Sequence, residues 1–481
     1  MDMYDCLIIG AGVVGAATAR ELSKYNLKIA VLEKGTEVCQ GTSKSNSAIV
    51  HGGYDASYGT LKGKLNVRGE RLFESLSKEL NIPFEKCGSL VLAFNDEDEK
   101  KLQDLYENGL KNGVEGLKII DKDEVLTMEP NVSLEVTKAL YCSEAGIVCP
   151  FNATFAFIEN AMDNGVELFL DEKVIGIEKS KDAILVRTEK GSEFQTKILI
   201  NSAGLYSDEI AKLAGDEEFT VKGRRGEYRI LDKKVSDIVK HVIFTTPTKA
   251  GKGVLVSPTV HGNIIVGPTS DPVEDKEDTR TTDSGINKVD EIALKLVPNL
   301  ALNETIRVFA GVRASISQGD FLIYESKNIK GMLNLGGIDS PGLASSPAIA
   351  EEVRDFVSKY IDLVENKNFI KERKAIPHFN DLSDTEKEEI LKRNPNYKRI
   401  ICRCEMITEG EIIEAIHRNA GARTVDGIKR RVRPGSGRCQ GGFCGPRILE
   451  ILSRELGIPV EEVLKENQGS NIVVGRTKGV L

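Results

Sequence analysis

The strand–turn–helix pattern at the start of the chain constrains its fold more than any other feature. An apolar run, residues 7–9, is typical of a buried parallel strand and leads into Gly10-x-Gly12-x-x-Gly15 and a helical stretch over residues 16–22. The glycines allow a tight turn, close approach of the backbone to a pyrophosphate and close packing of helix on strand. A second apolar run, residues 28–32, ends at Glu33, whose carboxylate can accept hydrogen bonds from ribose hydroxyls. The pattern therefore predicts a dinucleotide site on a Rossmann-type sheet.

The composition is that of a soluble protein of more than one domain. The chain has 481 residues, 40% of them apolar, and a net charge of −8, which argues against nucleic acid as a partner. No run of about 18 uncharged apolar residues occurs, so we expect no membrane span. The N-terminus carries Asp2 and Asp5 in place of the basic residues of a signal peptide, which predicts a cytoplasmic protein.

The nine cysteines fall into two groups. Four of them, Cys402, Cys404, Cys439 and Cys444, lie close together near the C-terminus, and the other five are scattered over the first 150 residues. In a cytosolic chain the compact group indicates a metal site, for which zinc and an iron–sulfur cluster are both candidates. Basic residues precede Cys439 and would stabilise an anionic cluster: Lys429, Arg430, Arg431, Arg433 and Arg438.

Further patterns place the remaining elements. Residues 60–115 are typical of helices, one over 61–80 and another over 96–112. Residues 166–200 are typical of strands that follow a helix over 151–164, and residues 220–330 of short strands punctuated by Gly and Pro. The last group includes a strand over 321–325. Residues 41–54 form a loop rich in small hydroxyl side chains, which suits a pyrophosphate and the edge of an isoalloxazine ring.

The glycine motif, together with Gly41-Thr-Ser43 and His51-Gly-Gly53, resembles the D-amino-acid-oxidase-like flavoproteins. Within them it is similar to FAD-dependent glycerol-3-phosphate dehydrogenases and oxidases and to L-2-hydroxyglutarate oxidases. The resemblance covers about residues 4–360. It implies an α/β fold over residues 1–365, in which a Rossmann-type FAD-binding domain carries an inserted antiparallel substrate sheet, mainly residues 220–330.

The pattern Cys402-x-Cys404 followed by Cys439-x4-Cys444 resembles the bacterioferritin-associated-ferredoxin type of [2Fe–2S] domain. This resemblance implies a small helical iron–sulfur module over residues 399–466 with the four cysteines as cluster ligands. A linker over 366–398, with one helix over 384–393, would precede the module. A tail over 467–481 would follow it.

The motifs and the flavoprotein resemblance together predict the residues that bind FAD. The helix after Ser340 would direct its positive end at the flavin, and Asp208 would help to open a helix beneath the cofactor. The predicted contacts are Gly10, Gly12, Val14, Gly15, Glu33, Lys34, Thr42, Ser43, Ser47, Val174, Ala203, Gly204, Asp208, Gly337, Gly342, Leu343 and Ala344.

Alcohol oxidation by a flavin also needs a base and a site for the anionic part of the substrate. His51, in the flavin loop, is the predicted catalytic base, and Arg313, at the end of an apolar strand, is the predicted anion-binding residue. Ser47, Lys252 and Ser340 are the other predicted substrate contacts. Further bases in the same half of the chain are Arg224, Arg225, Lys249 and Arg280.

The resemblance implies an FAD-dependent dehydrogenase that oxidises a small anionic secondary alcohol, foremost sn-glycerol 3-phosphate to dihydroxyacetone phosphate. Electrons would leave through the [2Fe–2S] cluster toward a partner flavoprotein or another acceptor subunit. L-2-hydroxyglutarate or another 2-hydroxy acid is the alternative substrate. An interpretation from another functional class is an electron-carrying flavin and iron–sulfur subunit of a larger complex. His51 and Arg313 beside the flavin motifs favour catalysis over this interpretation.

Overall fold

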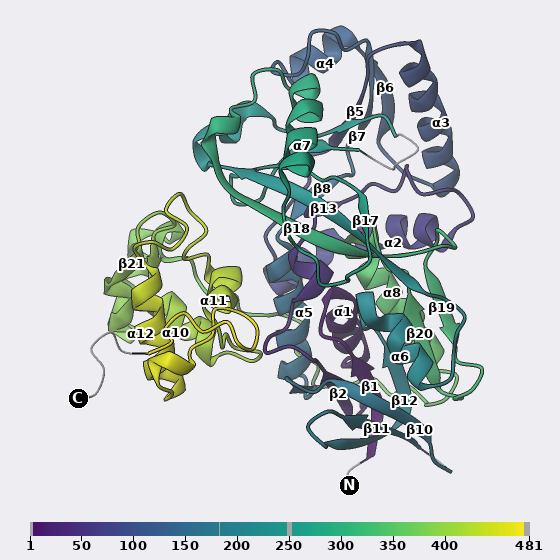
Figure 1. Ribbon diagram of the computed structural model, residues 1–481, viewed down its shortest axis with the longest axis vertical. Coiled ribbons are helices and arrows are strands. Elements are labelled where there is room, and N and C mark those ends of the chain that lie inside the picture. The colour runs from purple at the N-terminus through teal and green to yellow at the C-terminus, as the bar shows by residue number, and fades with distance from the viewer. Residues whose placement is uncertain (1–2, 182, 248–252, 476–481) are drawn as a thin grey trace.

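A computed structural model describes residues 3–181, 183–247 and 253–475 of the chain. Figure 1 shows a nucleotide-binding sheet at one end, a second sheet at the other, and a small C-terminal module beside them. No helix of these described ranges is both long enough and apolar enough to span a bilayer.

The nucleotide-binding sheet has the strand order β10-β11-β12-β1-β2-β9, and β20 and β19 continue from β12. The strands β1, β2, β9, β12 and β20 run parallel, whereas β10, β11 and β19 are antiparallel to their neighbours. Their bounds are Met3–Ile9 (β1), Ile29–Leu32 (β2), Glu167–Phe169 (β9), Val174–Lys179 (β10), Ile184–Thr188 (β11), Glu193–Asn201 (β12), Leu322–Glu325 (β19) and Met332–Gly336 (β20).

Helix α1 packs against both α5 and α8 beside this sheet, and α2 packs on α8. The close contact of α2 with α8 depends on Gly69, where a Cβ would lie 2.1 Å from the carbonyl oxygen of Ala344. The bounds are Val13–Leu22 (α1), Leu61–Leu80 (α2), Pro150–Asp163 (α5), Ser207–Leu213 (α6) and Gly342–Val357 (α8).

The second sheet has the order β17-β13-β16-β15-β14-β5-β7-β6, with β18 also paired to β13. All of its pairs are antiparallel except β14 with β5. The strands are Ser89–Ala93 (β5), Leu117–Asp121 (β6), Lys138–Cys142 (β7), Val221–Leu231 (β13), Val242–Thr245 (β14), Leu255–Pro258 (β15), Ile264–Gly267 (β16), Asp271–Val273 (β17) and Thr305–Ile316 (β18). Helices α3 (Asp96–Asn112), α4 (Lys122–Met128) and α7 (Asp283–Leu296) pack on it.

Two features of this part of the chain differ from the expectation. The helices expected over 61–80 and 96–112 are confirmed as α2 and α3, but the strands β4 (Phe84–Glu85) and β5 between them were not expected. β5, β6 and β7 join the sheet expected mainly from residues 220–330. The strand expected at 321–325 instead pairs with β20 in the nucleotide-binding sheet. A small third sheet, in the order β3-β8-β4, combines β4 with Ile49–Val50 (β3) and Gly146–Val148 (β8).

The C-terminal module has its own apolar core, to which Ile412, Ile428, Ile448 and Leu452 contribute. Its elements are the hairpin Ile400–Cys402 (β21) and Ile407–Thr408 (β22) and the helices Glu409–His417 (α10), Val425–Val432 (α11) and Gly445–Leu456 (α12). Helix α9 (Asp384–Arg393), with a Ser383–Glu386 capping box, precedes it.

A buried charge cluster attaches the module to the rest of the protein. The Glu37 carboxylate, 1% exposed, accepts hydrogen bonds from the backbone N–H groups of Arg423 and Thr424 and from Arg431, 2.7 Å away. The Arg431 guanidinium also lies over the ring of Phe155 on α5, 4.1 Å from its centroid. Each buried charge therefore has its partner in the other part of the chain.

Removing one partner should uncouple the module. Glu37→Ala leaves the Arg431 guanidinium buried without its carboxylate, which costs about 3–5 kcal/mol. Urea unfolding followed by circular dichroism should show an earlier transition for this variant. Glu189→Ala is the matched control, because Glu189 forms an exposed pair with Lys173, and such pairs contribute about 0–1 kcal/mol. Equal midpoints for the two variants would contradict the assignment.

Candidate active site

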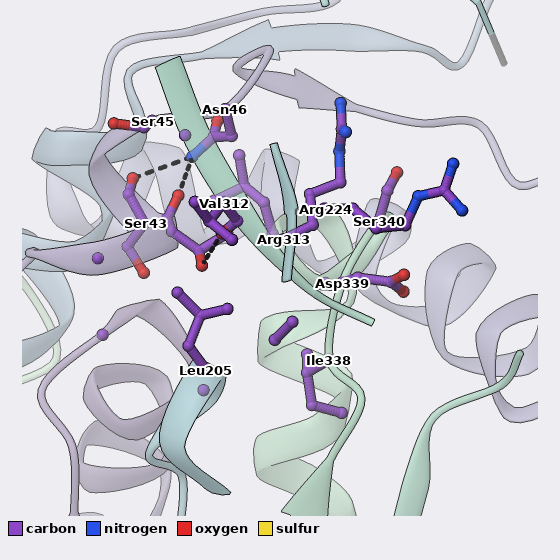
Figure 2. A pocket seen from close by; sticks show the side chains of 18 of the residues that line it. Ser43, Ser45, Asn46, Leu205, Arg224, Val312, Arg313, Ile338, Asp339 and Ser340 are labelled. Carbon is purple, nitrogen blue, oxygen red and sulfur yellow. Dashed lines mark hydrogen bonds between the residues drawn. The ribbon is translucent and has the colours of Figure 1, made fainter. Parts of the chain in front are cut away.

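A long cavity of 1920 Å³ extends from the turn between β1 and α1 to the edge of the second sheet. Its walls include η1 (Gly41–Lys44) and the loop after it, the start of α8, and parts of β13 and β18. Figure 2 shows side chains from these separate segments converging on the same space.

The glycine motif forms one end of the cavity. Gly10 has a φ of +102°, and a Cβ there would lie 2.6 Å from the carbonyl oxygen of Ser202. At Gly15 a Cβ would lie 1.9 Å from the carbonyl oxygen of Gly10, so only glycine allows α1 to approach β1 this closely. Helix α1 begins after Gly12, which has no side chain to cap it, and its N-terminus is therefore open to an anion.

Glu33, at the end of β2, lies beside this turn. Its carboxylate oxygens accept hydrogen bonds from the backbone N–H groups of Ala11 and Gly35, both at 2.8 Å. Burial raises the pKa of Glu33, while these two N–H groups act in the opposite direction. The carboxylate is thus held in a fixed position at the cavity wall, where it can also accept ribose hydroxyls.

The loop after Gln40 is fixed by hydrogen bonds to α1 and to the second sheet. The Ser43 hydroxyl accepts the Val13 N–H of α1 at 2.9 Å, and the Thr42 hydroxyl donates to the Val312 carbonyl of β18 at 2.7 Å. The Asn46 amide donates to the carbonyl oxygens of Thr42 and Ser43, as the dashed lines in Figure 2 show. The loop therefore connects the nucleotide-binding turn to the second sheet.

Most of the predicted FAD contacts line this cavity. Lys34 does so with its ammonium 3.5 Å from the ring centroid of Tyr206 and 3.2 Å from Glu277. The others are Gly10, Gly12, Val14, Glu33, Thr42, Ser43, Ser47, Val174, Ala203, Gly204, Gly342 and Leu343.

Gly15, Asp208, Gly337 and Ala344 do not line the cavity and act from behind its wall. The Asp208 carboxylate, in the first turn of α6, accepts the Val221 N–H at 3.0 Å and the Lys276 ammonium at 2.8 Å. Asp208 therefore links α6 to the start of β13.

Two arginines project from neighbouring strands at the other end of the cavity. Arg224 of β13 and Arg313 of β18 are directly opposite in the antiparallel register, and both line the cavity. Arg313 donates to the Thr269 carbonyl at 3.3 Å, and Arg224 donates to the Ser270 hydroxyl and carbonyl. Within the described residues no carboxylate forms an ion pair with Arg313. Because register partners lie side by side on one face of a sheet, these two residues could together hold a phosphate or carboxylate.

His51 lines the same cavity after β3, with its ring centroid 6.0 Å from that of Phe244 on β14. Asn66 of α2 donates to the His51 backbone carbonyl at 2.5 Å and so fixes this residue at the wall. Ser47 lies 3.4 Å from the Tyr228 hydroxyl, and Ser340 lies at the start of α8. Lys252 and Lys249 are outside the described residues.

Several cavity residues carry no signal in the sequence. Lys62 and Asp339 form an ion pair of 2.6 Å at the wall, and the Ser315 hydroxyl donates to Asp339 at 2.8 Å. Tyr228 and Phe244 come from β13 and β14, whose pairing brings them to the cavity. By contrast, Arg225 and Arg280 donate hydrogen bonds to the Asp278 carboxylate, so these two basic residues have an internal partner.

The four C-terminal cysteines lie together in two pairs. The sulfurs of Cys404 and Cys439 are 3.7 Å apart and partly exposed, whereas Cys402 and Cys444 are buried. A hydrogen bond from the Cys444 thiol lowers the pKa of Cys402 to about 6, with backbone N–H groups acting in the same direction, and it raises the pKa of Cys444.

The surrounding backbone suits an anionic cluster of four thiolates. N–H groups of Gly435 and Glu405 point at the Cys402 sulfur, and those of Phe443 and Gly441 point at Cys439. The cysteines, paired as Cys404 with Cys439 and Cys402 with Cys444, fit a cluster that binds two pairs of sulfurs.

Comparisons with known proteins agree with both sites. The profile of the FAD dependent oxidoreductase family (DAO) matches residues 5–356, and that of the BFD-like [2Fe–2S] binding domain matches residues 400–454. The chain is 50% identical to a glycerol 3-phosphate dehydrogenase of Caloramator mitchellensis, with 99% of each chain covered. It is 30% identical to an L-2-hydroxyglutarate dehydrogenase of Indibacter alkaliphilus, over 74% of this chain and 99% of that protein.

Among solved structures, the fold matches the dithionite-reduced L-alpha-glycerophosphate oxidase of Mycoplasma pneumoniae with FAD bound. The TM-score is 0.74 at 33% identity, and the match covers 77% of this chain and 98% of that one. The family profile, the relatives and the cavity agree on one cofactor, and the C-terminal profile favours an iron–sulfur cluster over zinc. The chain therefore belongs to the DAO family of FAD-dependent oxidoreductases, with FAD in its cavity and a BFD-like [2Fe–2S] domain at its C-terminal end.

Proposed function

We propose that this enzyme oxidises sn-glycerol 3-phosphate to dihydroxyacetone phosphate and passes the electrons through its [2Fe–2S] cluster to a partner protein. The observation that carries the substrate assignment is the facing pair Arg224 and Arg313, which lines the cavity together with His51. The names of the Caloramator mitchellensis dehydrogenase and of the Mycoplasma pneumoniae oxidase, to which the chain is similar, support the same substrate.

Each residue at this end of the cavity has a separate role in alcohol oxidation. Bound FAD supplies an acceptor for the hydride that leaves the alcohol carbon. Arg224 and Arg313 hold the phosphate, because two guanidiniums offer a set of charge-assisted donors to its oxygens. His51 takes the proton of the substrate hydroxyl at its ring nitrogen, so that the carbonyl of the product can form. Phe244 lies beside the His51 ring at the cavity wall.

We place this chemistry in the cytoplasm, since none of the nine cysteines, all of which the structure describes, forms a disulfide. The partner is a flavoprotein or another one-electron acceptor subunit, because a [2Fe–2S] cluster exchanges one electron at a time. The partly exposed pair Cys404 and Cys439 supports an exit at the surface of the module.

The substrate is tested by mixing the oxidised enzyme anaerobically with sn-glycerol 3-phosphate, L-2-hydroxyglutarate or glycerol and following flavin bleaching. We expect rapid bleaching with the phosphate ester and slow bleaching with glycerol, which offers no anion to the arginines. Faster bleaching with L-2-hydroxyglutarate would move the enzyme to the 2-hydroxy acid branch. Absence of bleaching with all three would favour a flavin subunit that only relays electrons.

Arg313→Ala should raise KM for sn-glycerol 3-phosphate by about tenfold to a hundredfold, the loss of one charge-assisted contact worth about 1.5–3 kcal/mol. Steady-state kinetics with an artificial acceptor measure this effect. The matched control is Arg280→Ala, because the Arg280 side chain is 83% exposed and pairs with Asp278. An unchanged KM for Arg313→Ala would place the phosphate elsewhere.

His51→Ala should lower the rate of flavin reduction at saturating substrate by about 10²–10⁴-fold, the usual contribution of a general base. Stopped-flow absorbance measures the rate directly. His417→Ala, at an exposed histidine paired with Glu455 on the module, should leave it unchanged. If the His51 variant reduced its flavin at the parent rate, another group would have to be the base.

Cys439→Ser should separate the two redox centres. Substrate should still bleach the flavin, whereas turnover with the physiological partner should collapse because the cluster loses a ligand. Iron content and the visible spectrum verify the loss, and Cys87→Ser, at a cysteine remote from the cluster, serves as the control. Full turnover by a folded variant without iron would make the cluster a structural element only.

A further inference from the structure

The end of the C-terminal module reaches the FAD cavity. Glu466, Asn467 and Gln468 line it, although the rest of the lining comes from residues 9–343. Figure 1 shows the module beside α5, and the segment after α12 returns from it toward the nucleotide-binding part. The cavity of the flavoprotein is thus completed by a segment that follows the cluster ligands in sequence.

Glu466 attaches this segment to the cavity wall. Its carboxylate lies 2.6 Å from the ammonium of Lys44 in η1 and also pairs with Arg430 of α11. Its backbone carbonyl accepts the Thr36 hydroxyl at 2.9 Å. Burial acts to raise the pKa of Glu466, but Arg430 and Lys44 outweigh it, and the pKa lies below its ordinary value. The anchor is therefore an ionised carboxylate between two cations.

A short loop then presents the next two residues. The N–H of Glu466 donates to the Ser470 hydroxyl at 2.8 Å, and the N–H of Ser470 donates to the Asn467 carbonyl at 3.1 Å, which closes the loop. Asn467 and Gln468 are exposed at its tip and line the cavity. Within the described part of the chain, neither side-chain amide has a hydrogen-bond partner.

The position of the loop identifies the part of the cofactor that it faces. Its anchor residue Thr36 lies just after Glu33, the acid placed for the ribose, and Gly35 between them donates to Glu33. Side-chain amides offer both donors and acceptors, which match the ring nitrogens and amino group of adenine and the ribose hydroxyls. The loop therefore lies beside the residues placed for the adenosine half of FAD.

We propose that residues 466–468 form a latch over the adenosine half of FAD. Asn467 and Gln468 contact the cofactor, and Glu466 is a positioning residue that holds them against Thr36 and Lys44. FAD affinity then depends on the iron–sulfur module, so that an enzyme with a misfolded module binds its flavin more weakly. This inference rests on the FAD site and is independent of which alcohol the enzyme oxidises.

The test compares the affinities of the apoprotein for FAD and FMN, since FMN lacks the adenosine half. In fluorescence titrations the double variant Asn467→Ala/Gln468→Ala should bind FAD about tenfold more weakly, the loss of two neutral hydrogen bonds, and FMN with parent affinity. Glu466→Gln should behave alike, because it removes the charge that Lys44 and Arg430 hold. The matched control is Lys465→Gln, whose side chain pairs with Asp426 inside the module.

Iron content and the cluster spectrum, measured on each variant, show that the module is folded. Should Glu466→Gln fail to fold, the double variant at the two exposed amides decides alone. An unchanged FAD dissociation constant in the double variant would overturn the latch. An equal loss of FAD and FMN affinity would also overturn it, because the effect would then not come from the adenosine half.

Discussion

The close approach of α1 to β1 is the constraint on which the rest of the structure depends. Because a Cβ at Gly15 would overlap the Gly10 carbonyl oxygen, any larger residue would push the helix away from the strand. The N-terminus of α1 would then leave the cavity, and the Ser43 hydroxyl would lose the Val13 N–H that it accepts. This bond fixes the loop after Gln40. A methyl group added at Gly15 would therefore also disturb the contact between this loop and the second sheet.

The strand pair β13 and β18 connects this close packing to the proposed anion site. The carbonyl of Val312 accepts the Thr42 hydroxyl, and a Cβ at Gly311 would lie 2.2 Å from the Ser45 carbonyl oxygen. Arg313 is the next residue of the same strand, and its register partner is Arg224. Strand β18, which contacts the loop after Gln40, thus also positions the guanidinium groups. In the proposed site, one strand therefore sets the place of the substrate anion relative to the cofactor, without an intervening flexible loop.

Much of the fold could be predicted from local sequence signals. The spacing of apolar residues gave α2 as Leu61–Leu80, and the charged segment 384–393 is the helix expected there. Signals of this kind act over a few residues, which is why they identify elements well. They do not report pairing between distant segments. The apolar run at β5 therefore went unrecognised, and the strand Leu322–Glu325 was assigned to the wrong sheet.

The same distinction applies to the active site. Glycine motifs and cysteine spacing carry their chemistry in a few consecutive residues, so these groups could be found without the structure. Arg224 belongs to the anion site through cross-strand register, and the Lys62–Asp339 pair joins α2 to the loop after β20. Tyr228 and Phe244 reach the cavity through pairing as well. No periodicity marks such residues, because their roles depend on contacts between segments far apart in sequence.

The attachment of the C-terminal module decides how the two redox centres can work together. Segment 366–398 does not behave as a flexible tether, because Arg373, 6% exposed, donates to Glu159 of α5, and the Asn160 amide donates to the Ile370 carbonyl. With Glu37 and Arg431 also buried between the parts, the module is held at several points along its length. Buried charge pairs of this kind favour a single arrangement, since any displacement leaves a charge without its partner. The cluster therefore keeps a constant separation from the FAD cavity, and its more exposed pair of cysteines faces the solvent.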